Sequence, residues 1–313
     1  MRRLGYRHQR TLARPTELDG PGFVTGQRVH VRLLPAPPDT GVLFIRADLP
    51  HHPVVSARVE LVTGTQRRTT LGGGAESITL VEHLLATLAG LRIDNCVIEL
   101  DGPEPPGLDG SAGGFVDAVF DAGVVLQPAR RSIWTVTEPV SVGQGGATVS
   151  LHPPDAATGS RLKTTYLLDY GPDSQIPRQT HTMTVSPDSF VREVATCRTF
   201  VLEREALMLR AKGVGRHLTP RDLLVFGADG LIDNRLRFAN EPARHKVLDL
   251  IGDLSLCGFD LVGHAVAYRS GHALNVSLAR ALAARAAAAE GGPSALPSIL
   301  RRPSLAGRKK VFV

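Results

Sequence analysis

The fold is built around residues 77–115, SITLVEHLLATLAGLRIDNCVIELDGPEPPGLDGSAGGF. Near the beginning, an acidic residue and a histidine, Glu82 and His83, stand side by side at the start of an apolar segment. Leucines at positions 84, 85, 88 and 91 recur at helical spacing, and Gly90 lies where such a helix is expected to end. The stretch therefore predicts a helix whose first turn carries two ionisable side chains.

A strand and a second helix follow. Residues 95–100 alternate, so that Cys96, Ile98 and Leu100 face away from Val97 and Glu99. A turn rich in proline and glycine leads to Asp-Gly-Ser at 109–111, where the next helix is expected to begin. The apolar face of that helix is predicted to comprise Phe115, Val116, Val119 and Phe120.

A related helix-forming stretch, EPARHKVLDLIGD, occupies residues 241–253. Pro242 suits the first turn of a helix. His245, Asp249 and Asp253 are spaced four apart and therefore share one face. Such a stripe is ordinarily solvated, but most of this helix is apolar, so we expect it to be buried. Buried histidine and aspartate need partners, and a metal ion is one.

The two stretches share a pattern. His83 precedes Gly90 by seven residues, and His245 precedes Gly252 by seven. Each histidine opens a helix of similar apolar pattern, which fits two related halves that meet across a shared site. The Glu82–His83 pair alone would be a weak indication, because a histidine at a helix start is more often structural than a metal ligand.

The composition is that of a globular protein. The chain has 313 residues, 42% of them hydrophobic, which is long enough for two domains with a substantial core. No apolar run approaches the roughly 20 residues that span a membrane, and the N-terminal MRRLGYRHQR lacks the apolar segment of a secretory signal. Cys96, Cys197 and Cys257 form no CxxC pair, so we expect reduced, buried thiols in a cytoplasmic protein.

The net charge of +6 does not indicate a nucleic-acid-binding protein. Residues 286–313 hold five basic residues against Glu290 alone, so +4 of the total lies there and only +2 in the other 285 residues. This tail contains glycine, proline and serine and is predicted to be disordered. The chain also lacks the basic, aromatic-rich pattern of single-strand binders.

The rest of the chain reads mainly as strands. In the first half, strands are predicted at 28–33 and 42–45, and residues 50–76 look like a small β excursion with strands at 58–63 and 67–71. The pattern resets near residue 128, where we expect a domain boundary. The elements predicted beyond it are a hairpin of 133–142 with 147–151, strands at 161–169, 180–185, 223–226 and 261–268, and helices at 187–194, 203–212 and 273–289.

Five motifs occur in order along the chain: LVEHLLATLAGLRIDNCVIEL, LDGSAGGFV, CRTF, RHKVLDLIGDL and SGHALN. In these residues the chain resembles the UDP-3-O-acyl-N-acetylglucosamine deacetylase family, the zinc enzymes of the committed step of lipid A biosynthesis. The resemblance runs from about residue 6 to residue 284. It implies an α+β fold of two similar domains, each a β-sheet with two α-helices, with the helices sandwiched between the two sheets.

The resemblance also implies a small insertion in each domain. The expected N-terminal domain comprises residues 1–128, with a β insertion at about 50–76. The expected C-terminal domain comprises residues 129–285, with an insertion at about 201–236 that shapes an apolar passage for an acyl chain. Residues 286–313 form the basic tail.

The metal site implied by the resemblance consists of His83, His245 and Asp249, which would bind Zn²⁺, with Fe²⁺ as the alternative metal. Two histidines and one carboxylate with an open fourth position are typical of a catalytic zinc site. Glu82 would be the general base that takes the proton of the attacking water. A negative charge at a helix start also interacts favourably with the helix dipole, which would account for Glu82 without any catalytic role.

Five further residues receive roles from the resemblance. His272 would be the electrostatic partner or general acid. Because a helix N-terminus disfavours the imidazolium, a carboxylate must offset it, and Asp253 is the one that the family match provides. Thr199 would help to stabilise the oxyanion. Lys246 would meet the carbonyl or diphosphate region of the substrate, and Phe200 would pack against the sugar or the acyl chain.

Two positions depart from the family pattern. Val24, in Phe-Val-Thr-Gly at 23–26, stands where the family usually has histidine. The last motif continues as Asn275-Val276-Ser277 rather than as two asparagines and a lysine. Neither departure affects a metal ligand, so they concern substrate contact and rate.

The implied reaction is hydrolysis of the 2-acetamido group of UDP-3-O-(3-hydroxyacyl)-N-acetylglucosamine, with release of acetate. The expected partner is this acylated UDP-sugar alone, without nucleic acid or stable membrane insertion, and the chain is expected to be a monomer. Two alternatives stay open: a metal amidase of the same fold that acts on another N-acyl sugar nucleotide, and a non-catalytic sugar-nucleotide-binding protein.

Overall fold

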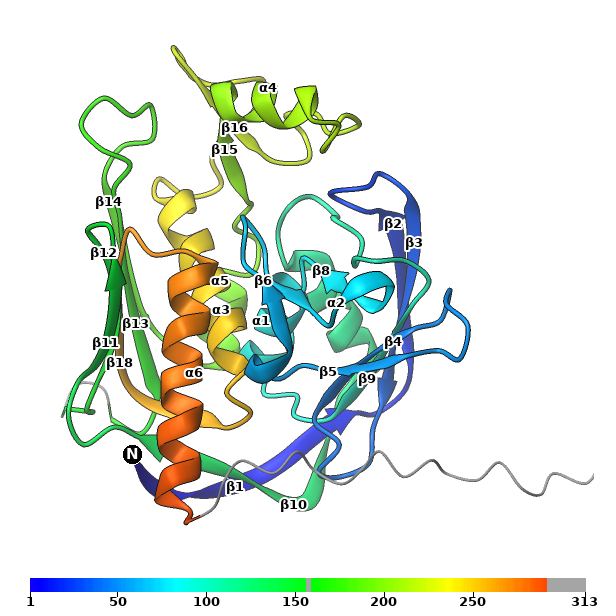
Figure 1. Ribbon diagram of the computed structural model, residues 1–313, viewed down its shortest axis with the longest axis vertical. Helices are drawn as coiled ribbons and strands as arrows, with labels where there is room; N and C mark the ends of the chain where they lie inside the picture. The colour runs from blue at the N-terminus through cyan, green and yellow to red at the C-terminus, as the bar shows by residue number, and fades with distance from the viewer. Residues whose placement is uncertain (156–158, 292–313) are drawn as a thin grey trace, which may run out of the picture.

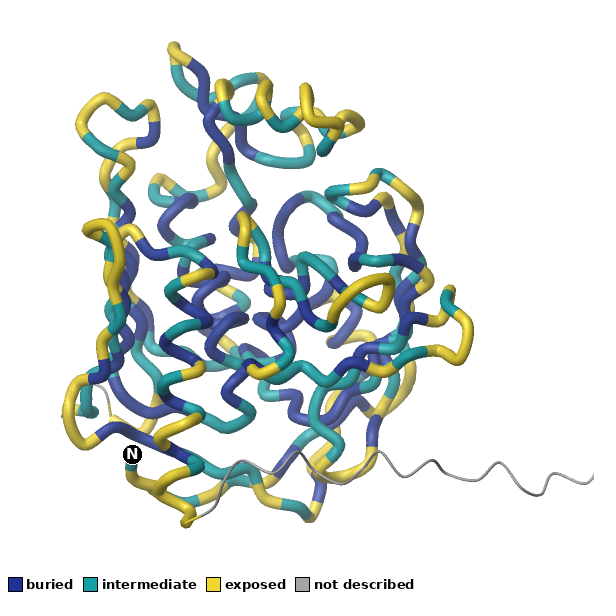
Figure 2. The backbone as a smooth tube through the Cα atoms, viewed as in Figure 1, coloured by how far each residue is buried: buried dark blue, intermediate teal, exposed yellow. Residues whose placement is uncertain are grey.

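The structure, a computed structural model, describes residues 1–155 and 159–291. Most of its helices lie in a layer between two β-sheets, a seven-stranded sheet on the left of Figure 1 and a five-stranded sheet on the right. Buried segments fill this layer and the sheets around it, whereas the outer loops are mostly exposed (Figure 2). The predicted α+β fold, with helices between two sheets, is confirmed.

The seven-stranded sheet joins the first strand of the chain to strands of the C-terminal half. β1 (Arg2–Leu12) pairs antiparallel with β10 (Val124–Thr135), and β10 pairs parallel with the start of β18 (Asp260–Tyr268). β18 then continues between β12 and β13. The other strands are β11 (Val140–Gln144), β12 (Ala147–His152), β13 (Leu162–Leu168) and β14 (Gln179–Thr184).

The five-stranded sheet has the order β2-β3-β9-β4-β5. Its central strand β9 is antiparallel to β3 and parallel to β4. In β3, Val29, Val31 and Leu33 are buried at alternate positions, as the sequence pattern predicted. The strands are β2 (Thr16–Pro21), β3 (Arg28–Pro35), β4 (Val42–Arg46), β5 (Val54–Ser56) and β9 (Cys96–Leu100).

The helix layer contains five helices among the described residues (Figure 1). At its centre, α1 (Glu82–Gly90) packs against α5 (Glu241–Ser255), and both are buried along most of their length. The others are α2 (Gly113–Ala122), α3 (Pro187–Glu193) and α6 (His272–Ala289). Both stretches that the sequence singled out therefore meet in the middle of the protein.

Two glycines permit the close packing in this layer. A Cβ at Gly252 on α5 would lie 2.2 Å from the carbonyl oxygen of Glu82, so only glycine lets the first turn of α1 approach so closely. A Cβ at Gly90 would lie 2.4 Å from the ring of Phe190 on α3. The glycines that follow His83 and His245 at the same spacing thus both serve close helix contacts.

Two small sheets lie outside the main layers. One is formed by β6 (Val62–Gly64), β7 (Thr70–Leu71) and β8 (Ile78–Thr79), close to the start of α1. The other projects beyond the helix layer at the top of Figure 1, together with α4. Its elements are β15 (Phe200–Leu202), α4 (Glu203–Ala211), β16 (Leu224–Gly227) and β17 (Gly230–Leu231).

Several sequence predictions were wrong in detail. Residues 59–61 form a 3₁₀-helix, which leaves only β6 of the strand predicted at 58–63. Residues 133–135 belong to β10 and not to a hairpin, because they pair with β1 and β18. Phe120, assigned to the apolar face of α2, is 57% exposed, and Ala118 is buried instead.

The predicted division between residues 1–128 and 129–285 stays a prediction, and it falls inside β10. Of the predicted tail, residues 286–289 form the end of α6, and 292–313 lie outside the described residues. All three cysteines are free and buried, as predicted. Within the described ranges, no helix has both the length and the apolar character that a membrane crossing requires.

Candidate metal centre

Two histidines and a carboxylate converge where α1 packs against α5. His83 lies in the first turn of α1, and His245 and Asp249 lie one turn apart on α5. The three residues are buried, and their candidate ligand atoms all lie within 4.8 Å of one another. His83 Nε2 and His245 Nε2 lie 3.6 Å and 3.4 Å from Asp249 Oδ1. The structure thus brings together the three residues that the sequence suggested as metal ligands.

The donor atoms of this cluster fit a metal ion. Asp249 Oδ1 is buried and has no hydrogen-bond partner among the described residues, which is costly unless another group binds there. His245 Nδ1 lies 3.1 Å from the carbonyl oxygen of Cys197. If Nδ1 carries the proton and donates to this carbonyl, Nε2 keeps its lone pair for a metal, an arrangement typical of ligating histidines. Two imidazoles and one carboxylate suit Zn²⁺.

The electrostatics of the cluster favour the metal-binding forms of its side chains. Burial alone would raise the pKa of the Asp249 carboxyl, but the adjacent His245 ring and the ammonium group of Lys246 hold it well below its usual value. Lys246 Nζ donates to Asp249 Oδ2 at 2.9 Å. Burial lowers the pKa of His245 to about 4, so its imidazole is neutral at pH 7. Metal binding requires an ionised carboxylate and neutral imidazoles.

Glu82 lies beside the cluster at the start of α1. Its Oε2 accepts the backbone N–H of Thr69 at 3.0 Å, and its Oε1 lies 3.9 Å from His272 Nε2. The side chain is almost fully buried, and burial raises the pKa of its carboxyl group. A raised pKa makes a carboxylate a better proton acceptor, as general-base catalysis requires.

His272 begins α6 and is held by a buried hydrogen-bond network. Its Nδ1 lies 2.9 Å from Asp253 Oδ2, which also accepts Asn275 Nδ2 at 2.9 Å. Asp253 Oδ1 accepts the hydroxyl of Thr69 at 2.6 Å. Burial would lower the pKa of His272, but the charges of Asp253 and Glu82 outweigh it and raise the pKa to about 9. His272 is therefore an imidazolium at pH 7, with the expected carboxylate in contact.

Thr199, Phe200 and Lys246 border the cluster on the side of the second small sheet. The rings of Phe200 and His245 meet edge to face, with centroids 6.1 Å apart. Lys246 Nζ lies 5.5 Å from the centroid of the Phe200 ring. The backbone N–H of Thr199 donates to the carbonyl of Gly110 at 2.8 Å, which ties the segment just before β15 to the turn before α2.

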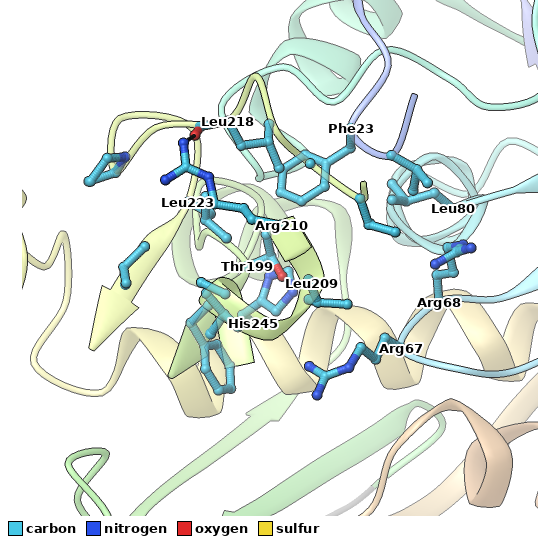
Figure 3. Close-up of a pocket in the computed structure, with 18 of the residues that line it drawn as sticks. Phe23, Arg67, Arg68, Leu80, Thr199, Leu209, Arg210, Leu218, Leu223 and His245 are labelled. Carbon is cyan, nitrogen blue, oxygen red and sulfur yellow. Dashed lines mark hydrogen bonds between the residues drawn. The ribbon is translucent and has the colours of Figure 1, made fainter. Parts of the chain in front are cut away.

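A cavity of about 310 Å³ opens onto this cluster (Figure 3). All the residues with suggested roles line it except Asp253, which lies behind His272. The apolar part of its wall comes mainly from residues 201–232, which follow Phe200, and from the turn that carries Phe23. The labelled side chains of this part in Figure 3 are Phe23, Leu209, Leu218 and Leu223. The arrangement therefore places a potential metal site at one part of a largely apolar cavity.

A buried ion pair fixes the segment that orients His245. Arg198 Nε lies 2.9 Å from Glu241 Oε1 in the first turn of α5, and Glu241 also accepts the backbone N–H of Arg198 at 3.0 Å. Both side chains are almost fully buried. This pair holds the carbonyl of Cys197 close to the helix that carries His245 and Asp249.

Three partners in the site were not found from the sequence. Thr69 contacts both Glu82 and Asp253, although it comes from a part of the chain with no recognisable signal. Asn275, considered only as the start of a departure from the family pattern, is buried and bonds to Asp253. The Cys197 carbonyl faces His245. Asn275 lies in the motif SGHALN and Cys197 in the motif CRTF. These two motifs were therefore the sequence signal from which both partners could have been found.

Known sequences resemble the chain over most of its length. A family model described as UDP-3-O-acyl N-acetylglycosamine deacetylase matches residues 9–284. Three similar proteins are each named UDP-3-O-acyl-N-acetylglucosamine deacetylase. That of Thermosynechococcus vestitus is 42% identical over 275 residues, which cover 88% of this chain and 94% of the relative. That of a Nostoc species is 39% identical over 284 residues (88% and 98%), and that of an Anaeromyxobacter species 38% over 279 residues (88% and 88%).

Proposed function

The chain belongs to the UDP-3-O-acyl-N-acetylglucosamine deacetylase family, and from this premise we propose how its buried cluster performs the reaction. The reaction is hydrolysis of the 2-acetamido group of UDP-3-O-(3-hydroxyacyl)-N-acetylglucosamine, a step of lipid A biosynthesis. The carbonyl carbon gains a bond to the oxygen of water, the carbon–nitrogen bond breaks, and acetate and a free amine result. The observation that most supports this proposal is the unpaired Asp249 Oδ1 between two histidines and beside Glu82.

We assign His83, His245 and Asp249 as the ligands of a catalytic Zn²⁺, with Fe²⁺ as the alternative metal. When bound, such an ion acts as a Lewis acid on the amide carbonyl and lowers the pKa of water to near neutrality. The residues of this chain prepare the site: Lys246 keeps Asp249 ionised, and the Cys197 carbonyl fixes the ring of His245.

Glu82 is assigned as the general base. Burial raises the pKa of its carboxyl group, so it accepts a proton from the attacking water more readily than an exposed glutamate does. The N–H of Thr69 holds Oε2, and Oε1 faces His272. Glu82 is therefore oriented by the backbone just before β7 of the first small sheet.

His272 is assigned as the positively charged partner of the reaction. Its imidazolium would stabilise negative charge on the reacting carbonyl oxygen or donate a proton to the departing amine. Asp253 keeps it protonated and fixes which nitrogen faces the cavity. Thr199 is assigned to oxyanion stabilisation, and Lys246 and Phe200 to substrate binding, because all three line the same cavity.

We propose that the chain acts as a cytoplasmic monomer on its UDP-sugar substrate and has no nucleic-acid partner. The three free, buried cysteines are typical of a reducing compartment.

The test of this function compares two substrates on one purified protein. We expect turnover of UDP-3-O-(3-hydroxyacyl)-N-acetylglucosamine and little turnover of the same molecule without its acyl chain. Without that chain, the substrate buries no apolar surface in the cavity and binds more weakly. Acetate release is the measurement. Turnover of another N-acyl sugar nucleotide alone would favour the amidase alternative. Binding of the UDP-sugar without any hydrolysis would favour the non-catalytic one.

A second prediction concerns pH. Asp253→Asn removes the charge that most strongly raises the pKa of His272, so this pKa is expected to fall. Because we assign the imidazolium to catalysis, activity is lost as the pH rises through the pKa of His272. The alkaline fall of kcat should therefore move at least about one pH unit lower in the variant. Asp117→Asn, on the exposed side of α2, is the matched control. An unchanged alkaline limb in Asp253→Asn would contradict the assignment.

A further inference from the structure

Glu104 is a fully buried carboxylate that the catalytic cluster does not use. It is 0% exposed, and no cation among the described residues forms an ion pair with it. Its two oxygens instead accept the backbone N–H of Val24, at 2.9 Å and 3.1 Å, and one of them that of Thr25, at 2.7 Å. A buried charge whose bonds all go to one backbone turn holds that turn in a single geometry.

The turn at residues 22–26 is shaped to receive this carboxylate. A Cβ at Gly22 would lie 2.5 Å from Glu104 Oε1, so any side chain there would displace the carboxylate. The backbone N–H of Gly26 donates to the carbonyl of Gly22 at 3.0 Å and closes the turn. Gly26 has a φ of +73°, in the left-handed region that favours glycine.

The tip of this turn forms one wall of the cavity. Phe23 and Val24 both line it, and Figure 3 shows Phe23 beside Leu218 of the second insertion. Phe23 also packs on Gly107, where a Cβ would lie 2.7 Å from its ring. The segment that contains Glu104 and Gly107 therefore fixes both the backbone of the turn and the ring that it presents.

The insertion docks on the same turn. The backbone N–H of Gly215 lies 3.4 Å from the carbonyl of Val24. The ring of His217 covers Gly26 so closely that a Cβ on Gly26 would lie 2.5 Å from His217 Nδ1. The turn thus supports the loop that supplies Leu218 to the same apolar wall.

We propose that Glu104 is a positioning residue for acyl-chain selectivity. Through the turn at 22–26 it holds Phe23 and Val24 against the insertion loop and so keeps the apolar wall of the cavity closed around an acyl chain. The inference rests on the proposed function and names the part of that site that discriminates chain length. Each methylene group that this wall buries contributes to affinity, so the effect grows with chain length.

Glu104→Gln is the test, because it keeps the size of the side chain but turns amide N–H groups toward the N–H donors of the turn. The probes are decanoate, dodecanoate and tetradecanoate, whose Kd values are measured by calorimetry, and UDP-sugars with a long or a short 3-O-acyl group. We expect the preference for tetradecanoate over decanoate, and for the long over the short acyl substrate, to fall roughly tenfold, the effect of about two lost methylene contacts. The kcat for the short substrate should stay the same.

Glu99→Gln is the matched control, because Glu99 lies on the preceding strand β9 and pairs with Arg32 away from the cavity. Phe23→Ala should reproduce the loss of preference, and the double variant with Glu104→Gln should lose little more, because both act through one wall. Phe23→Ala also tests the wall if Glu104→Gln does not fold.

Three results would overturn the proposal. They are a folded Glu104→Gln protein with lowered stability but unchanged chain-length preference, a Phe23→Ala protein with unchanged preference, and a wild-type protein that binds none of the fatty acids. Fatty-acid binding needs neither metal nor turnover. A wild-type protein that binds tetradecanoate but deacetylates no substrate would instead contradict the proposed function.

Discussion

Replacing Glu82 by alanine is expected to lower kcat by about 10²–10⁴-fold, the usual contribution of a general base, while the protein still binds its metal. Glu82 is not part of the ligand cluster, whose atoms come from His83, His245 and Asp249. The carboxyl group lies beside that cluster with a pKa raised by burial. Losing it removes the proposed proton acceptor but none of the three candidate ligand atoms.

Glu82→Gln distinguishes the proposed role of Glu82 as a base from its structural role as the acceptor of the Thr69 N–H. Glutamine retains an oxygen that can accept the Thr69 N–H now bonded to Oε2, but its amide accepts no proton near neutral pH. Its kcat should therefore fall as far as that of Glu82→Ala, with a smaller loss of stability. Glu76→Ala, an exposed glutamate shortly before α1, is the matched control and should keep full activity. Wild-type kcat in either Glu82 variant would show that another group takes the proton.

His245→Ala is expected to lose both the metal and the activity. It removes one of the three proposed protein ligands, so metal affinity should fall by more than the roughly 100-fold seen when only an outer partner of a ligand is lost. The remaining pair, His83 and Asp249, lies 3.6 Å apart and still faces Lys246. Metal content after dialysis and acetate release are the measurements.

His181→Ala provides a matched control for this loss. His181 is also a buried histidine whose Nε2 has no hydrogen-bond partner among the described residues, but it lies on β14 and does not line the cavity. The control should keep its metal and its kcat. A His245→Ala protein that retains metal and turnover would remove His245 from the ligand set.

The sequence predicted the parts of the site that depend on local spacing. Four-residue spacing placed His245, Asp249 and Asp253 on one face of α5, and the leucine pattern placed Glu82 and His83 at the start of α1. The shared seven-residue spacing from His83 to Gly90 and from His245 to Gly252 indicated that the two helices meet. The sequence did not show which groups pack against these glycines. In the structure, the ring of Phe190 packs against Gly90 and the carbonyl of Glu82 packs against Gly252.

Contacts between distant segments could not be predicted in this way. Thr69 joins Glu82 and Asp253 from the position just before β7, which no sequence pattern marks as part of the site. β1 joins the sheet of the C-terminal half through β10, because strand pairing depends on the whole fold and not on the strand itself. Phe120 looked like a core residue by spacing alone but lies on the exposed side of α2.

The central claim is that one metal ion held by His83, His245 and Asp249 works with Glu82 to hydrolyse the amide. The most direct test is metal content, by mass spectrometry of elements, measured together with acetate release for wild-type, Glu82→Ala and His245→Ala proteins prepared side by side. The structure leads us to expect metal with activity in the first, metal without activity in the second, and neither in the third. Equal metal content in all three, or activity in the metal-free protein, would contradict the claim.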